Sequence, residues 1–356
     1  MGSATDLPRV LAVTNMYPTL RDPTYGVFIA TQMESIAASG VPVSVQFING
    51  RRGMREYIRG LFQVRRRART EDFDLVHAHY GLSGFVSAFQ PLPLVVSFCG
   101  DDILGTPNGK GGLTAKSRMV RRLSYAVLRR ADAIICKSEE MKRALPRSCN
   151  RERVHVIPNG VDVTRFRPGD RLAARQILNL DPGARLILFP STPSERRKRL
   201  DLAEAAVLQL AAYGLPAKLW VVQGVPPVDM PNYFRAADSL LLTSDWEGSP
   251  NVVKEAICCD LPVVSVNAGD ASVWIRMTPG CRIVDRDPAA IARGLEEVLA
   301  SRRSVDGGPV RRELALELVA QRVIAVYRDV LAGTHARWTG PGAKGPGSLW
   351  WGAFRR

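Results

Sequence analysis

Short apolar runs alternate with longer amphipathic stretches along most of the chain. In the first half the apolar runs lie at 10–14, 41–47, 75–78, 94–98 and 133–136, with a helical pattern at 28–39. Runs of this length, bounded by Gly, Pro and polar residues and separated by helix-length segments, predict buried parallel strands joined by helices. We therefore expect an α/β domain built on a doubly wound sheet.

The same pattern restarts after the turn at Asn159-Gly160. Apolar runs at 185–189, 219–222, 239–243 and 263–266 predict strands, and helical patterns cover 201–212, 251–259 and 319–331. The expected division is two Rossmann-like domains, a crossover helix and a disordered basic tail, at 1–166, 167–318, 319–333 and 334–356. Because ligands of parallel sheets bind beyond the carboxyl ends of the strands, the polar residues that follow each apolar run are the candidates for a site.

The most informative of these segments follows the run at 239–243. Glu247 and Glu255 bracket a Gly-Ser-Pro-Asn turn, in which we expect Ser249 to cap a helix and Pro250 to be its first residue. The unpaired amides and positive end of such a helix hold a diphosphate without a metal, and each carboxylate accepts hydrogen bonds from a vicinal diol. The other interpretation is a capped surface helix with two solvated acids.

Residues 230–270, with this acidic pair and the run Leu261-Pro262-Val263-Val264-Ser265, resemble the donor site of retaining GT-B glycosyltransferases. More narrowly, the segment is similar to the glycogen-synthase-like group called glycosyltransferase family 4, or group 1. The resemblance implies two Rossmann-like doubly wound domains facing a cleft, with a C-terminal helix that crosses back to the first domain. It implies that Glu247 contacts the transferred sugar and Glu255 the ribose. The other implied donor contacts are Gly26, Gly248, Ser249, Pro250, Asn251 and Val252.

The resemblance also implies a basic pair that stabilises the departing diphosphate. Lys198 stands in register for one member, but Glu195 occupies the position where related sequences carry arginine. Arg196 or Arg197 is then the expected substitute.

A second departure lies in the first domain, where many relatives have histidine at the position of Cys99. Cysteine hydrogen-bonds poorly, so the candidates there become Asp101, Asp102 and His79, the last expected at the mouth of the cleft.

Composition is that of a globular protein. The chain has 356 residues, 46% of them hydrophobic, and no apolar run approaches the roughly 20 residues of a membrane span. A basic-then-apolar signal pattern is missing from the first residues, so we expect a cytoplasmic protein. The six cysteines are scattered without metal-ligand spacing, and we expect neither a metal nor a cofactor.

The net charge of +15 comes largely from arginines at 51–69 and 116–130. Apolar residues interleave the first cluster, which fits a basic amphipathic helix lying on an anionic membrane surface, at the inner face of the membrane. An equally weighted alternative is a solvated basic face. No recognised nucleic-acid motif accompanies the charge, so we expect no nucleic-acid partner.

The function we expect is retaining transfer of a hexose from a nucleotide-diphosphate sugar to a hydroxyl of a saccharide or lipid-linked acceptor, in cell-surface polysaccharide or glycolipid biosynthesis. Lys198, an adjacent arginine and the helix start would supply electrostatic stabilisation. Two alternatives stay open. One is a catalytically impaired sugar-nucleotide-binding protein, suggested by Cys99 and Glu195; the other is a nucleotide-sugar epimerase, which needs more acid and base side chains than the four histidines supply.

Overall fold

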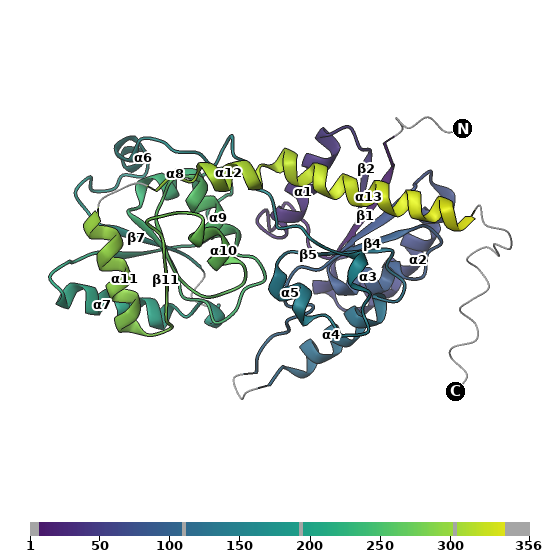
Figure 1. The fold of residues 1–356 in the computed structure, drawn as a ribbon, viewed down its shortest axis with the longest axis horizontal. Helices are drawn as coiled ribbons and strands as arrows, with labels where there is room; N and C mark the ends of the chain where they lie inside the picture. The colour runs from purple at the N-terminus through teal and green to yellow at the C-terminus, as the bar shows by residue number, and fades with distance from the viewer. Residues whose placement is uncertain (1–6, 109–111, 192–194, 302–304, 339–356) are drawn as a thin grey trace. The chain divides into compact units, whose positions relative to one another are not determined.

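A computed structural model describes residues 7–108, 112–191, 195–301 and 305–338 (Figure 1). The chain forms two compact units. The first unit takes in residues 1–19, 25–157 and 320–356, and the second unit takes in 20–24 and 158–319. Each unit contains one parallel sheet with helices between its strands, as the sequence pattern predicts.

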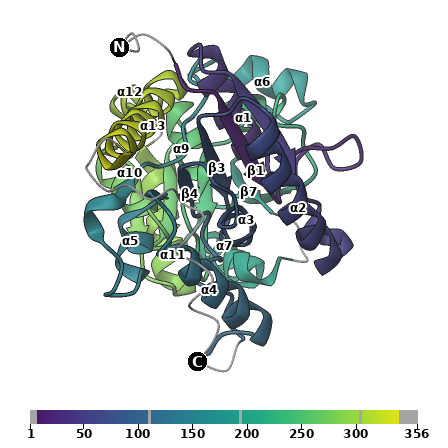
Figure 2. The same cartoon turned by 90° about the vertical axis from the view of Figure 1, so that its right-hand side faces the viewer.

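The first unit holds a six-stranded sheet in the order β2-β1-β3-β4-β5-β6. Its strands are β1 (Val10–Thr14), β2 (Val43–Phe47), β3 (Leu75–His79), β4 (Leu94–Ser97), β5 (Ala133–Cys136) and β6 (Val154–Val156). Figure 2 shows β1, β3 and β4 side by side. The register pairs His79 with Thr14 and with Ser97, so the polar ends of these strands meet at one edge. The apolar runs did not predict β6, because a three-residue strand is too short to show a pattern.

Helices cover both faces of this sheet. They are α1 (Val27–Ala38), α2 (Met54–Thr70), α3 (Gly81–Ser87), α4 (Ala115–Val127) and α5 (Glu139–Ala144), with short 3₁₀ turns at Gly50–Arg52 and Arg151–Arg153. On one face, Val13 and Val96 pack in a buried cluster with Val64 of α2, Val86 of α3 and Val127 of α4.

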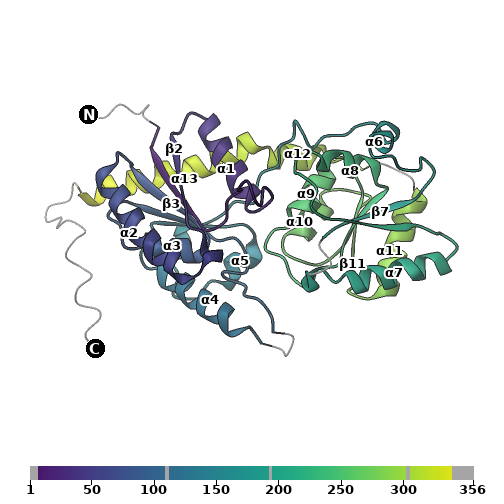
Figure 3. The same cartoon turned by 180° about the vertical axis from the view of Figure 1, so that it is seen from behind.

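The long C-terminal helix α13 (Leu316–Trp338) lies on the other face of the first sheet, as the opposite views of Figures 1 and 3 show. It begins in the second unit, and from Ala320 onwards it belongs to the first. The Tyr327 hydroxyl lies 2.6 Å from Nδ1 of His77, which fixes the helix to β3. A disordered tail was expected to start at residue 334, but α13 continues to Trp338. Residues 339–356 of that predicted tail lie outside the described residues.

The second unit holds a five-stranded sheet in the order β11-β10-β9-β7-β8. Its strands are β7 (Leu186–Pro190), β8 (Lys218–Val222), β9 (Ser239–Leu242), β10 (Val263–Val266) and β11 (Arg282–Val284). Its helices are α6 (Arg171–Ile177), α7 (Leu200–Ala212), α8 (Met230–Ala236), α9 (Asn251–Cys258), α10 (Ala271–Arg276), α11 (Pro288–Ser301) and α12 (Gly308–Leu314), with a 3₁₀ turn at Arg196–Lys198.

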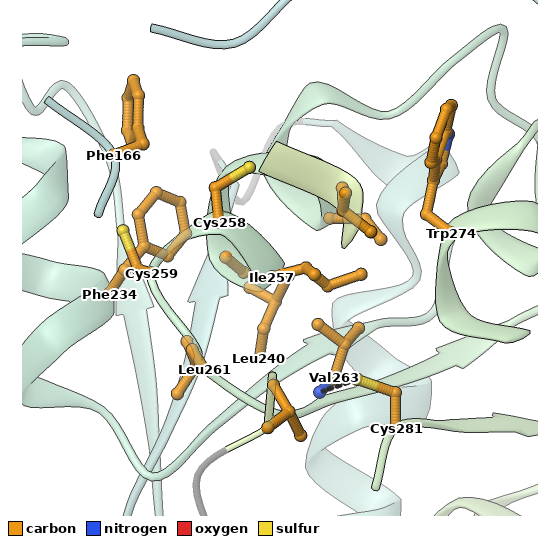
Figure 4. Packing of buried hydrophobic residues seen from close by; sticks show 14 of the residues in the cluster. Phe166, Phe234, Leu240, Ile257, Cys258, Cys259, Leu261, Val263, Trp274 and Cys281 are labelled. Carbon is orange, nitrogen blue, oxygen red and sulfur yellow. Dashed lines mark hydrogen bonds between the residues drawn. The ribbon is translucent and has the colours of Figure 1, made fainter. Parts of the chain in front are cut away.

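A cluster of buried hydrophobic residues covers each face of the second sheet. On one face, alternate strand residues such as Leu241 and Val264 pack with α7 and α11. On the other, Leu240 and Val263 pack with Phe234 of α8 and Ile257 of α9 (Figure 4). The alternation of strand side chains between two helix layers makes the sheet doubly wound and leaves its carboxyl edge for loops.

No helix among the described residues is both long enough and apolar enough to span a bilayer.

Candidate functional site

Three side chains converge on the carboxylate of Glu247, which is only 8% exposed. Lys198 Nζ lies 2.6 Å from Oε1, Arg197 Nη1 lies 2.8 Å from the same oxygen, and the Ser244 hydroxyl donates to it at 2.8 Å. Burial alone would raise the pKa of Glu247, but the two cations outweigh burial and lower it. The carboxylate therefore stays ionised, and its second oxygen has no hydrogen-bond partner among the described residues.

The position of Lys198 depends on contacts between two neighbouring strands of the second sheet. It ends the 3₁₀ turn that follows β7, and the Thr243 hydroxyl, just after β9, lies within hydrogen-bond distance of the carbonyls of Lys198 (2.7 Å) and Arg199 (3.0 Å). Arg199 has a left-handed φ of 55° and occupies the N-cap position immediately before α7. These contacts bring the cation to the carboxyl edge of β9, where Glu247 lies.

Arg197, rather than Arg196, is the second cation at Glu247. Its guanidinium also lies 5.3 Å from the centre of the Trp246 ring and 3.8 Å from Glu195. Arg196 is exposed, and the ion pairs of Glu247 among the described residues are with Arg197 and Lys198. The structure thus places one arginine and Lys198 together even though Glu195 stands where an arginine was expected.

The start of α9 differs from the prediction at Ser249. The helix begins at Asn251, the preceding Pro250 occupies the capping position, and no side chain caps the helix. The Ser249 hydroxyl instead donates to Asp270 Oδ2 at 2.9 Å and accepts from Lys254 Nζ. Two buried charged groups therefore engage the hydroxyl that the sequence assigned to capping.

The first turn of α9 meets the Asn159-Gly160 turn within the second unit. Asn159 Nδ2 donates to Asn251 Oδ1 at 3.1 Å. Gly248 lies in the loop before the helix, and Val252, in its first turn, is partly buried against the core. Each of these residues flanks the unpaired amides at the helix N-terminus, which attract anions.

Glu255, one turn further along α9, is in a different electrostatic environment from Glu247. Its side chain is partly buried, and burial raises its pKa to about 7 against the opposing effect of Lys254. The two acids therefore differ in charge state near neutral pH, with Glu247 ionised and Glu255 close to its midpoint.

His79 in the first unit is fully enclosed at the end of β3, and its expected place at the mouth of a cleft stays a prediction. Neither ring nitrogen has a hydrogen-bond partner among the described residues, and the ring centre lies 4.1 Å from that of His77. Burial, together with His77 and Lys137, lowers its pKa well below the usual value, so the ring is neutral.

Asp101 and its neighbour Asp102 have different surroundings. The Tyr80 hydroxyl donates to Asp101 at 3.3 Å, and the Asp101 side chain is partly exposed. Asp102 is buried and accepts from the amides of Gly81, Cys99 and Gly100. Burial and Asp101 raise the pKa of Asp102 to about 7. Asp102 thus organises the loop after β4, while Asp101 stays accessible.

Gly26 precedes α1 with a left-handed φ of 71°. A Cβ at this position would lie 2.4 Å from the carbonyl carbon of Met16 and 2.7 Å from the amide nitrogen of Tyr17. The absence of a side chain is therefore required by the neighbouring backbone, and the predicted approach to a donor phosphate stays a prediction.

Sequence reasoning missed Ser244, Lys254 and Asp270. The signal for Lys254 was a single lysine in the apolar stretch of α9, between Val253 and Ala256. Among the described residues, no group of three or more His, Cys, Asp or Glu side chains has an arrangement that would hold a metal ion.

Two family models match the chain, one for each half. Residues 12–165 match Glycosyltransferase Family 4, and residues 201–312 match Glycosyl transferases group 1. A D-inositol 3-phosphate glycosyltransferase of Catenulispora acidiphila is 27% identical over 75% of this chain and 74% of its own length. Another of that name, from Geodermatophilus obscurus, is 26% identical over 72% of this chain and 66% of its own length.

Solved structures give the fold independently. A sucrose-phosphate synthase from Thermosynechococcus elongatus has a TM-score of 0.74 at 18% identity, covering 91% of this chain and all of that one. HepE of Anabaena, solved with UDP and glucose, has a TM-score of 0.66 at 15% identity, covering 90% and 99%. With both halves matched by glycosyltransferase models, the chain belongs to the group 1 glycosyltransferases and has the GT-B fold.

Proposed function

We propose that this protein transfers a sugar, with retention of anomeric configuration, from a nucleotide-diphosphate sugar to an acceptor hydroxyl. The observation that carries the proposal is the convergence of Lys198 and Arg197 on Glu247 beside the start of α9. Departure of a diphosphate builds negative charge while the anomeric carbon becomes cationic. A site that presents cations, helix amides and one ionised carboxylate in a partly buried loop matches that charge distribution.

Each residue has a distinct part in this proposal. Lys198 and Arg197 stabilise the departing diphosphate, together with the amides at the start of α9. Glu247 orients the transferred sugar through its second carboxylate oxygen, which has no hydrogen-bond partner among the described residues. Glu255 accepts from the ribose diol, and the leaving diphosphate takes the acceptor proton. These groups supply the positive charge themselves, so we propose that departure does not require a metal.

The donor class is supported by solved proteins of the same fold, which include HepE with UDP and glucose and a starch synthase IV with ADP and acarbose. The curated relatives are named for transfer to inositol 3-phosphate. We propose a saccharide or lipid-linked acceptor, bound mainly by the first unit with His79 and Asp101 near its site, in cell-surface polysaccharide or glycolipid synthesis. Inositol 3-phosphate is the alternative that the relatives suggest.

The proposal of an anionic membrane partner is based on features of helix α2. Gly60, Val64 and Ala68 face the core, whereas Met54, Ile58 and Phe62 are 57%, 56% and 66% exposed. These three residues form one apolar stripe at intervals of four, and arginines flank it along the helix. Exposed apolar side chains bordered by cations fit the interface of an anionic lipid surface, which would keep a cytoplasmic protein at the inner face of the membrane.

A donor panel tests the proposed function. Purified protein is incubated with UDP-, GDP- and ADP-sugars, with and without inositol 3-phosphate or lipid-linked acceptors and with and without EDTA, and the released nucleoside diphosphate is measured. The expected result is acceptor-stimulated release from one donor despite EDTA, with the anomeric configuration of the product retained by NMR. Binding of a donor without release would favour the catalytically impaired alternative, and an altered sugar nucleotide without release would favour an epimerase.

A further inference from the structure

A buried charged network lies directly behind the donor loop, and the mechanism above does not use it. Lys254 of α9 is fully buried, and its ammonium donates to the Ser249 hydroxyl and lies 3.6 Å from Asp270 Oδ2. The same carboxylate oxygen accepts from the Ser249 hydroxyl and from Trp274 Nε1, both at 2.9 Å. Ser249 therefore joins a buried cation to a buried anion, two residues before α9 begins.

A second contact ties the same two loops together through the backbone. Gly269, which precedes Asp270, has a left-handed φ of 59°. A Cβ there would lie 3.0 Å from the carbonyl oxygen of Glu247 and 3.1 Å from that of Gly248. The loop between β10 and α10 thus supports the donor loop closely on both sides of Gly248, through main-chain packing at Gly269 and through hydrogen bonds at Asp270.

Stability alone explains this network poorly. Burying a lysine and a carboxylate costs desolvation energy, and apolar residues of similar volume often give equal or greater stability. Asp270 Oδ1 is also buried without a hydrogen-bond partner among the described residues, which adds to that cost. What the network does accomplish is to fix the position of Ser249, between Glu247 and the N-terminus of α9.

We propose that Lys254 and Asp270 are positioning residues for the donor: acting through Ser249, they hold the 248–251 turn so that Glu247 and the first amides of α9 face the donor diphosphate together. This inference rests on the proposed function, because it assigns these two residues to the same donor site. The network lies under the loop rather than on the ligand, so its loss changes the geometry of donor binding without removing a direct contact.

The chain offers a matched control for removing a buried cation. Arg175 is 1% exposed and pairs with Asp238 at 2.7 Å, and it donates to the carbonyl of Ala236. Asp238 immediately precedes β9, whereas Glu247 follows it, so this pair lies at the opposite edge of the sheet from the donor loop. Replacement of either cation by methionine removes a buried charge, but only one of the two replacements affects the loop.

The experiment compares Lys254→Met with Arg175→Met. Thermal unfolding measures stability, and calorimetric titration with UDP, GDP and ADP measures nucleotide binding. We expect both variants to unfold at lower temperature than the wild type. Only Lys254→Met should weaken binding of the nucleotide that the wild type binds, by about tenfold or more. The same variant should raise the KM for the donor and leave the KM for the acceptor unchanged. Wild-type affinity in Lys254→Met, or an equal loss in Arg175→Met, would overturn the inference.

Ser249 supplies a second, milder comparison should Lys254→Met fail to fold. Ser249→Ala keeps both charges but removes the hydroxyl that links them, and Ser249→Thr keeps a hydroxyl. We expect the alanine variant to bind nucleotide several-fold more weakly and the threonine variant to recover most of the affinity. Equal nucleotide affinity in the alanine and threonine variants would contradict the positioning role.

The wild-type measurement distinguishes failure of the proposed function from failure of the positioning role alone. If the wild type binds none of the three nucleotides and releases none from any donor, the proposed function and this inference both fail. If the wild type binds and turns over while the variants match it, the inference alone fails.

Discussion

Lys198 Nζ and Glu247 Oε1 lie 2.6 Å apart although 49 positions separate the two residues in the chain. The contact joins the turn after β7 to the loop after β9, two strands that are neighbours in the second sheet. Because Arg197 reaches the same oxygen, the carboxylate holds both cations in place before a donor arrives. The catalytic charges of the proposed mechanism are therefore preorganised.

Replacing Lys198 with methionine should lower kcat by about 10²–10³-fold, because a preorganised charge at the departing diphosphate is lost. Steady-state release of nucleoside diphosphate measures the effect. Arg196→Met is the control, since that side chain is exposed and the ion pairs of Glu247 among the described residues are with Arg197 and Lys198, and its kcat should stay within about twofold of wild type. A comparable loss in both variants would contradict the assignment of Lys198.

The raised pKa of Glu255 predicts how stability depends on pH. Its folded-state pKa of about 7 lies above the unfolded value near 4.3, so its contribution is complete below about pH 4.3 and is lost as pH rises through 7. Glutamine cannot ionise, so Glu255→Gln should gain stability relative to wild type between pH 5 and 8, by up to about 3 kcal/mol. Urea unfolding across this range provides the measurement.

A flat profile for Glu255→Gln across the same pH range would show that burial does not perturb this acid.

Replacing Tyr327 with phenylalanine should destabilise the first unit by about 1–3 kcal/mol, because Nδ1 of buried His77 then loses its partner. Urea unfolding measures the loss. Tyr125→Phe is the comparison, since the hydroxyl of that partly buried tyrosine donates to the Ala144 carbonyl, a less enclosed partner. If Tyr125→Phe proved the more damaging change, the contact between α13 and β3 would matter less than the structure indicates.

Alanine substitutions at Gly26 and Gly214 distinguish the cost of a steric clash from the cost of backbone strain. Both have positive φ, 71° and 81°, but a Cβ at Gly26 would meet the backbone of Met16 at 2.4 Å, whereas one at Gly214 would meet nothing within 4 Å. Alanine at Gly214 should cost about 1 kcal/mol of unfolding free energy from strain alone. Alanine at Gly26 should cost several times more in the same denaturation assay; equal losses would mean that the Met16 loop moves freely.

The exposed stripe on α2 predicts lipid binding. Sedimentation with anionic vesicles should retain the wild-type protein, and the pair Ile58→Ser and Phe62→Ser should reduce the bound fraction about tenfold or more, since each removes an apolar side chain from the interface. Leu208→Ser is the control, because that side chain is 74% exposed on α7, a helix whose sequence contains no arginine or lysine. Unchanged sedimentation of the double variant would leave the arginines as a solvated face.

The sequence by itself determined the periodic elements and the main candidates. Apolar runs predicted β1, β7, β9 and β10 because buried parallel strands need continuous hydrophobic residues on both faces, and the pattern around Glu247 and Glu255 indicated the family. Strands of three residues, such as β6 and β11, were not predicted because they are too short to show a hydrophobic pattern.

Only the tertiary structure decided which polar groups meet. Local rules made Ser249 a helix cap, but buried Lys254 and Asp270 engage its hydroxyl, and nothing local chose Arg197 over Arg196 as the partner of Glu247. His79 has the same adjacent residues in the sequence whether it is open or enclosed; the strands and helices around it decide that it is enclosed and neutral. Periodicity is a short-range property of the chain, whereas ion pairs and burial depend on segments that only folding brings together.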